Sequence, residues 1–225
     1  MLGEPVPDDI IRPTLIEATI MIFTTRYTVY RLPIIIYATI LIIITGSLPL
    51  QAQPVKLRSF SKIGGNFTLT DMHGKQVQLS DFNKKIVILY FGYTYCPDIC
   101  PNTLFVITDV LKQLGDSAKL IQVLFVTLDP ERDNEKRLRE YLEIFDPRIL
   151  GLTGDKQLIS KVARKYVIRF RKKNLDEEGA YIINHSSYAF LIDRQGIIRY
   201  LYPYKTTSGF VAKTVYKLLS ETSGR

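Results

Sequence analysis

The stretch KIVILYFGY (residues 85–93), followed by CPDIC (96–100) and the run 101–114, decides the fold expected for this chain. The first segment is nearly continuous, apolar and β-branched, which is typical of a strand buried on both faces. In the run that follows CPDIC, a proline stands in the first turn and apolar residues recur on one helical face. These apolar residues are Leu104, Ile107, Leu111 and Leu114. The sequence therefore predicts a buried strand, a loop carrying both cysteines, and a helix.

Further strands and helices are predicted on both sides of this unit. We expect a hairpin at 67–70 and 76–79, strands at 119–128, 149–152 and 166–171, helices at 134–145 and 156–165, a second hairpin at 187–192 and 197–202, and a last helix capped by Thr207. Alternating strands and helices predict an α/β fold with a central mixed β-sheet flanked by helices. Cysteines at a strand-to-helix corner suit a thioredoxin-like fold.

Composition excludes several classes of protein. With 2 Cys in 225 residues, the chain is not a disulfide-stapled miniprotein, and its mean hydropathy of +0.05 argues against several membrane spans. A four-ligand zinc finger would need every Cys and His at unsuitable spacings. Residues 51–225 carry a net charge of +9, but the basic residues are scattered except at 169–173. We find no nucleic-acid-binding motif, so the simplest interpretation of the positive charge is a solvated protein surface.

The N-terminal part contains one charge-free apolar run, residues 32–50. Its length matches a bilayer core, so we expect a transmembrane anchor there, preceded by a cytoplasmic segment 1–31. A cleaved signal peptide is the alternative, with 32–50 as its apolar region and Met21 as a possible start. Both interpretations place a linker at 51–66 and a folded domain at 67–225 outside the cytoplasm.

Cys96 and Cys100 form the chemical centre of the sequence. Residues four apart stand over one another on a helical turn, so both sulfurs can face one point. The positive end of the following helix favours thiolate at Cys100, and also at Cys96. Two thiolates suit Cu(I), with a third ligand completing the site. Two unrelated buried cysteines or a structural disulfide are the alternatives.

His185 is the candidate third ligand. It lies just before the second hairpin, and in a thioredoxin-like fold the loop that leads there passes close to the cysteine corner. The other histidine, His73, is expected as an exposed turn residue. The segment DPERD (129–133) joins a strand to a helix, and Asp133 is the expected N-cap of that helix.

Three blocks together resemble the Sco/SenC family. They are FGYTYCPDICP (91–101), TLDPERD (127–133) and INHSSYAFLID (183–193), within a resemblance that covers residues 60–222. This family comprises membrane-anchored, thioredoxin-like copper proteins that help to assemble cytochrome c oxidase. The resemblance implies copper, as Cu(I) and also as Cu(II), bound by Cys96, Cys100 and His185. It places Asp129 beside the ligands.

Other residues and partners follow from the same interpretation. Asp98 lies between the cysteines, where its charge opposes thiolate formation, and Tyr93 and Tyr95 are expected as walls of the pocket. The implied partners are the copper-receiving subunit of cytochrome c oxidase and a thiol reductant or upstream copper donor. The implied location is a bacterial inner membrane facing the periplasm, or the mitochondrial inner membrane.

Competing functions use the same two cysteines. A membrane-tethered thiol–disulfide oxidoreductase or redox sensor would cycle Cys96 and Cys100 between thiol and disulfide. The C-x-x-x-C spacing argues against the oxidoreductase, and we find no motif for a thiol peroxidase. We expect a metallochaperone and not an enzyme. His185 separates these hypotheses, because copper binding needs it and dithiol exchange does not.

Overall fold

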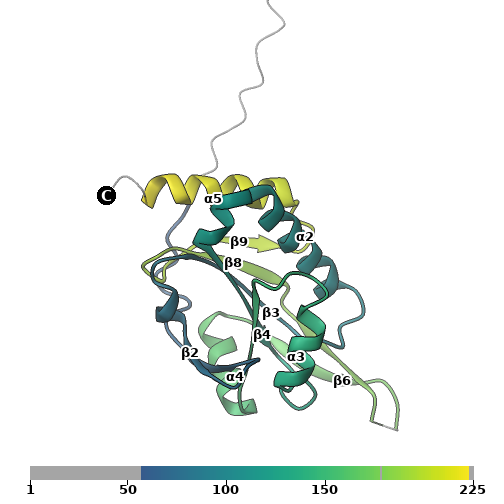
Figure 1. Cartoon of the computed structure of the whole chain (residues 1–225). Helices are drawn as coiled ribbons and strands as arrows, with labels where there is room; N and C mark the ends of the chain where they lie inside the picture. The colour runs from purple at the N-terminus through teal and green to yellow at the C-terminus, as the bar shows by residue number, and fades with distance from the viewer. Residues whose placement is uncertain (1–56, 178, 223–225) are drawn as a thin grey trace, which may run out of the picture. The chain divides into compact units, whose positions relative to one another are not determined.

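The computed structural model describes residues 57–177 and 179–222 (Figure 1). The elements in chain order are β1 Thr68–Asp71, β2 Gln76–Gln78, the 3-10 helix η1 Leu79–Phe82, β3 Ile86–Gly92, α2 Ile99–Leu114, η2 Gly115–Leu120, β4 Ile121–Thr127, α3 Glu135–Leu142, β5 Ile149–Thr153, α4 Lys156–Lys165, β6 Phe170–Asn174, β7 Tyr181–His185, β8 Tyr188–Ile192, β9 Ile198–Pro203 and α5 Ser208–Thr222. Most follow the predicted periodicity to within a few residues.

A seven-stranded mixed sheet forms the centre of the domain, in the order β2-β1-β5-β4-β3-β8-β9. Strands β3, β4 and β5 run parallel, while β8 runs antiparallel to β3 and β1 antiparallel to β5. Helices α2 and α5 lie side by side against the sheet (Figure 1), and α3 contacts β5. The predicted α/β class with a central mixed sheet flanked by helices is therefore confirmed.

Strand β3 is the most deeply buried strand and positions the cysteine loop. All its residues are buried because it lies between β4 and β8 and is covered on both faces. This explains why its sequence reads as a continuous apolar run and not as an alternation. The chain leaves β3 at Gly92 and enters α2 at Ile99, so the cysteine motif spans the strand-to-helix corner.

The described residues, 57–177 and 179–222, belong to one compact unit. This unit has a continuous hydrophobic core, to which β3, β4 and the helices contribute, and we expect it to fold on its own. Within the predicted linker 51–66, the backbone N–H groups of Arg58 and Phe60 donate to the carbonyls of Arg199 and Ile198 in β9, at 3.1 and 3.0 Å.

The edge strand predicted at 166–171 was wrong in position. Val167 has φ +57, and its N–H donates to the Arg164 carbonyl, so this part of the chain still turns away from α4. A β-branched residue in that conformation breaks an extended strand. The strand instead runs Phe170–Asn174 and pairs with β7, a strand that the sequence analysis missed, in a separate two-stranded ribbon.

The N-cap predicted for α3 was also wrong. Asn134 caps this helix, and its side-chain oxygen accepts from the Arg137 N–H at 2.8 Å. Asp133 is fully buried instead and serves the cysteine loop. The helix ends at Leu142, three residues before the predicted end at 145. In the part of the chain that the structure describes, no helix is long and apolar enough to cross a membrane. The predicted anchor, 32–50, lies outside the described residues.

Candidate metal centre

Three side chains from three parts of the chain meet at one point. Cys96 lies in the loop after β3, Cys100 is the second residue of α2, and His185 is the last residue of β7. One donor atom from each lies within 4.8 Å of the other two. The Cys100 Sγ and His185 Nε2 atoms are 3.6 Å apart. The predicted group of two cysteines and one histidine is thus brought together, although His185 ends a strand and does not lie in a loop.

The histidine is oriented by its second ring nitrogen. His185 Nδ1 lies 3.0 Å from the carbonyl oxygen of Ser186. A carbonyl only accepts, so Nδ1 carries the proton and Nε2 is left with a free lone pair facing the sulfurs. Tyr93 supports this arrangement: its ring stands perpendicular to the imidazole at 6.0 Å, and its hydroxyl accepts from the Ile183 N–H at 3.2 Å. Tyr93 is therefore a wall of the site, as expected.

The two sulfurs have opposite electrostatic environments. Both are free cysteines, and the hydrogen bond from the Cys100 thiol lowers the pKa of Cys96 to about 3. The Cys100 backbone N–H also points at the Cys96 Sγ, at 3.5 Å, as a group at the start of a helix does. The same contact and burial raise the pKa of Cys100. The surroundings therefore favour a thiolate at Cys96, as expected, and disfavour one at Cys100, where the helix end alone predicted it.

Tyr90 contacts the buried sulfur of Cys100. Its hydroxyl donates to the Cys100 Sγ at 3.5 Å, and its side chain is completely buried in β3. Burial raises the pKa of Tyr90, so it remains a protonated donor. A neutral donor of this kind stabilises negative charge on Cys100 when a metal ion displaces the thiol proton.

A buried carboxylate holds the start of the cysteine loop. Asp133 accepts hydrogen bonds from the Thr94 N–H at 2.9 Å, the Thr94 hydroxyl at 2.7 Å and the Thr127 hydroxyl at 2.7 Å. These bonds tie the loop to the end of β4. Burial nevertheless raises the pKa of Asp133, because the surrounding core disfavours the charged form.

A second cluster links the cysteine loop to the strand that carries His185. The Arg132 guanidinium lies 4.6 Å from the Tyr95 ring centroid and 3.5 Å from that of Tyr181. Asp129 is buried, accepts from Arg132 Nε at 2.5 Å and accepts from the Tyr181 hydroxyl at 2.8 Å. Because Tyr181 begins β7, this cluster fixes the strand relative to the loop.

The remaining candidate residues lie nearer the protein surface than the three donor residues. Asp98 is exposed and accepts from the Asn102 side chain at 2.5 Å, so its charge faces solvent. Tyr95 is 50% exposed and forms an outer edge of the site, where a pocket wall was expected. His73 is exposed in its turn, as expected, and takes no part in the site.

This donor set suits a soft metal ion. Metal–sulfur bonds of about 2.3 Å around one ion place three ligands roughly 4 Å apart, close to the spacing seen here. Two sulfurs and one imidazole are ligands that Cu(I) accepts in three-coordinate geometry. The site therefore needs only small movements and the loss of one thiol proton to hold such an ion.

Comparison with known proteins decides the family. The SCO1/SenC profile matches residues 55–220, which is most of the chain. The chain belongs to the SCO1/SenC family. Among curated relatives, an SCO2-like protein of Rickettsia felis is 37% identical over 68% of this chain and 75% of its own length. The mitochondrial SCO2 homolog of Bos taurus is 38% identical over 65% of this chain and 56% of its own length.

Solved SCO1/SenC structures share the fold. Arabidopsis thaliana ScoI with copper bound matches with a TM-score of 0.66 and 31% identity, over 71% of this chain and 99% of that one. Bradyrhizobium japonicum ScoI with copper bound matches with a TM-score of 0.65 and 36% identity, over 69% and 99%. The thioredoxin-like mixed α/β fold expected from the cysteine corner is thus confirmed. These solved chains also correspond to the domain that is described here.

Sequence reasoning missed several supporting residues of this SCO1/SenC site. Tyr90 gave one signal, because it carries a polar tip inside an otherwise apolar strand. Thr94 and Asp133 gave a weaker signal, since a polar residue next to a buried strand needs a partner. The stacking of Arg132 on Tyr181 joins residues far apart in the chain, and no local pattern announces it.

Proposed function

We propose that this chain is a copper metallochaperone that binds one copper ion through Cys96, Cys100 and His185. One observation carries the proposal: three soft or borderline donor atoms lie within 4.8 Å of one another, and the imidazole is held in the tautomer that offers Nε2. Copper-bound structures of related proteins from two organisms support the choice of metal. The pair of free sulfurs favours Cu(I), and Cu(II) is a second state that the imidazole accommodates.

Family membership supports a role in copper delivery. We propose that the chain passes copper to the subunit of cytochrome c oxidase that holds the CuA centre. It would receive copper from an upstream donor, and a thiol reductant would keep the two cysteines available. A Cys96–Cys100 disulfide uses both sulfurs, so oxidation removes the capacity for copper. Asp129 is proposed to act through Tyr181, which it positions, and not as a ligand.

The topology is part of the proposal. Residues 32–50 would anchor the chain in a bacterial or mitochondrial inner membrane, with 1–31 on the inner side, a linker at 51–66 and the domain 67–225 on the outer side. Protease added to spheroplasts or mitoplasts should remove the domain. Protection of the domain while the outer compartment is open would refute this topology. A mature N-terminus near Gln53 would favour a cleaved signal peptide over an anchor.

Copper competition tests the site directly. Residues 55–225, fully reduced, are titrated with Cu(I) against a chromogenic chelator, alongside Cys96→Ala, Cys100→Ala and His185→Ala. We expect one copper per chain, no tight binding in either cysteine variant, and a loss of about tenfold or more in affinity for His185→Ala. His73→Ala is the matched control, because it removes the other histidine, and it should bind normally.

The same experiment separates the chaperone from the dithiol enzyme. Full copper retention in His185→Ala would overturn the three-ligand site. If His185→Ala also kept all thiol–disulfide exchange activity of the parent chain, the oxidoreductase alternative would be favoured. Tight Cu(I) binding by the fully oxidised domain would show that the cysteines are not ligands.

A further inference from the structure

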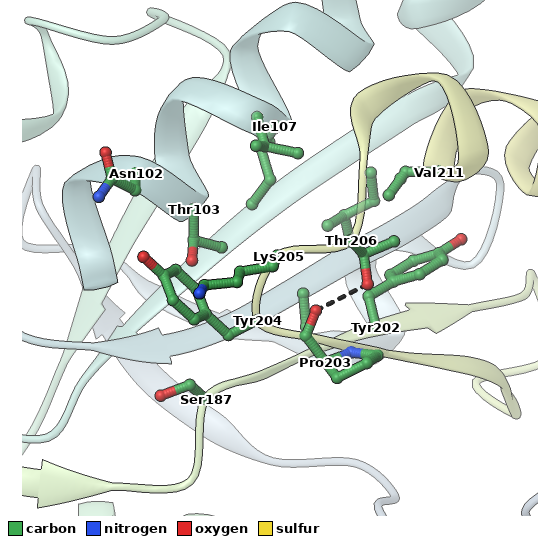
Figure 2. A pocket seen from close by; sticks show the side chains of 13 residues that line it. Asn102, Thr103, Ile107, Ser187, Tyr202, Pro203, Tyr204, Lys205, Thr206 and Val211 are labelled. Atoms are coloured by element: carbon green, nitrogen blue, oxygen red, sulfur yellow. Dashed lines mark hydrogen bonds between the residues drawn. The ribbon is translucent and has the colours of Figure 1, made fainter. Parts of the chain in front are cut away.

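The domain has an apolar cavity of about 190 Å³ that is separate from the metal centre, and Figure 2 shows the side chains that line it. Its walls are the first turns of α2, the start of β8 and the loop between β9 and α5. Thr103 and Ile107 project from the helix, Ser187 lies opposite, and Tyr204 and Lys205 come from the loop (Figure 2). Val106 of the same helix also lines the cavity. None of the three donor residues lines it.

The cavity is preformed. Its floor consists of side chains that are buried in the domain core: Ile88, Ile107, Ala189, Tyr202 and Val211. The rim is a tight turn in which the N–H and the hydroxyl of Thr206 both donate to the Pro203 carbonyl, at 3.1 and 2.7 Å. Lys205 adopts φ +71 in this turn, a conformation that costs energy in any residue with a side chain. Strained residues of this kind mark functional loops more often than others.

Size and chemistry limit the ligand. An apolar protein cavity of about 150 Å³ accepts benzene, so 190 Å³ is enough for one aromatic ring with a short tail. It is smaller than the pockets of about 300 Å³ or more that hold larger ligands.

Charge at the rim selects an anion. Lys205 is the only charged residue among the thirteen that line the cavity. Among the described residues, Lys205 takes part in no ion pair, so its ammonium group is available to a ligand. Thr103 and Ser187 also line the cavity, but their hydroxyls donate to the carbonyls of Ile99 and His185, at 2.8 and 3.4 Å. The contact with a carboxylate is therefore assigned to Lys205 alone.

We propose that this cavity binds one aromatic ring joined to a carboxylate by a short chain. The ring would occupy the apolar floor, and the carboxylate would meet Lys205 at the rim. A free aromatic acid and a peptide that ends in phenylalanine share this chemistry. The proposal does not depend on copper, because the cavity and the donor atoms have no lining residue in common.

The test uses ¹⁵N-labelled residues 55–225 without metal, titrated with 3-phenylpropionate and followed by amide chemical shifts. We expect saturable binding with a Kd of about 1 mM, as ligand efficiency allows for so small a molecule. The shifts should cluster at Thr103, Ser187 and Val211. Failure to saturate by 20 mM, or shifts that cluster elsewhere, would overturn the proposal.

Two variants test the two halves of the ligand. Val106→Phe fills the cavity and should abolish binding. Lys205→Gln is an exposed change that leaves the floor intact, and it should weaken 3-phenylpropionate about two- to fivefold, as a screened ion pair predicts. It should leave 3-phenylpropionamide unaffected. Lys161→Gln, an exposed lysine on α4, is the matched control and should bind as the parent does.

Two further arms separate the sources of the ligand and the role of folding. The peptide Gly-Gly-Ser-Phe is compared with its C-terminal amide and with 3-phenylpropionate. If the peptide with a free carboxylate binds more tightly than 3-phenylpropionate, the natural ligand is the C-terminal end of a peptide. If the two bind equally, the natural ligand is a small aromatic acid. If Val106→Phe does not fold, the Lys205→Gln comparison alone decides. Equal binding of acid and amide by the parent, with no effect of Lys205→Gln, would refute the anion preference.

Discussion

Gly92→Ala should displace the Cys100 sulfur and so weaken Cu(I) binding. Gly92 ends β3, and a Cβ built there would lie 2.9 Å from the Cys100 Sγ and 2.8 Å from the Phe125 Cε2. Ordinary contacts between such atoms are about 3.5–4.0 Å, so one or both neighbours must move by roughly 0.6 Å or more. Phe125 is fully buried in β4, which leaves little room for its ring to yield.

The magnitude follows from these contacts. Overpacking of this kind costs about 1–3 kcal/mol of unfolding free energy. Metal–ligand distances tolerate about ±0.2 Å, so a displaced Cys100 sulfur should lower Cu(I) affinity about tenfold or more. The assays are urea unfolding of the metal-free domain and chelator competition. Gly209→Ala is the matched control, because its Cβ would meet nothing within 4 Å.

A second substitution separates the two contacts. Phe125→Leu removes the ring atoms that Gly92→Ala would strike and leaves the sulfur in place. The double variant should therefore be less destabilised than the sum of the single ones, while copper binding stays weak. Unchanged stability and unchanged copper affinity in Gly92→Ala would refute this account of the close approach.

Three other variants test the supporting groups. Asp133→Asn should lower the unfolding free energy, measured in urea, by about 1–3 kcal/mol, because the asparagine amide cannot accept from all three buried donors. An unchanged unfolding free energy would mean that the cysteine loop does not depend on these hydrogen bonds. The rate at which iodoacetamide alkylates Cys96 should vary little between about pH 5 and 8, since the pKa of Cys96 is lowered to about 3. In Cys100→Ala, the rate should again rise with pH. A rate in the parent protein that rises tenfold per pH unit would contradict the lowered pKa of Cys96. Arg132→Ala should weaken Cu(I) binding, and Arg132→Lys should restore little of it, because an ammonium group cannot stack as a planar guanidinium does. The exposed Arg171→Ala is the control. Full restoration of binding by Arg132→Lys would mean that only the charge of Arg132 matters.

Local patterns predicted most of the elements. The strand at β3 and the helix α4 follow directly from apolar periodicity, since residues near in sequence decide burial on one face. Strand β7 escaped prediction and β6 was placed too early, because both strands are short, β6 is mostly exposed and basic, and β7 shows no regular alternation of burial. Nothing in such a segment except its pairing makes it a strand.

The candidate ligands were also readable from the chain, but their protonation was not. A helix N-terminus alone favours thiolate at both cysteines. The structure instead buries Cys100 against Tyr90 and makes it a hydrogen-bond donor to Cys96. The charge on each sulfur thus depends on burial and on one contact between the two, which spacing does not encode.

The sequence by itself determined the class of fold, the cysteine corner and the identity of three candidate ligands, because apolar periodicity and residue chemistry are local properties. Only the tertiary structure decided that His185 ends a strand, that Ser186 orients its ring, and that Asp133 braces the loop where it was expected to cap a helix. Two of the contacts that build the site join residues far apart in the chain: Thr94 and Asp133 are 39 positions apart, and Cys100 and His185 are 85 positions apart. Their contacts arise from the way the sheet brings strand ends together, and the sheet order is a property of the whole domain.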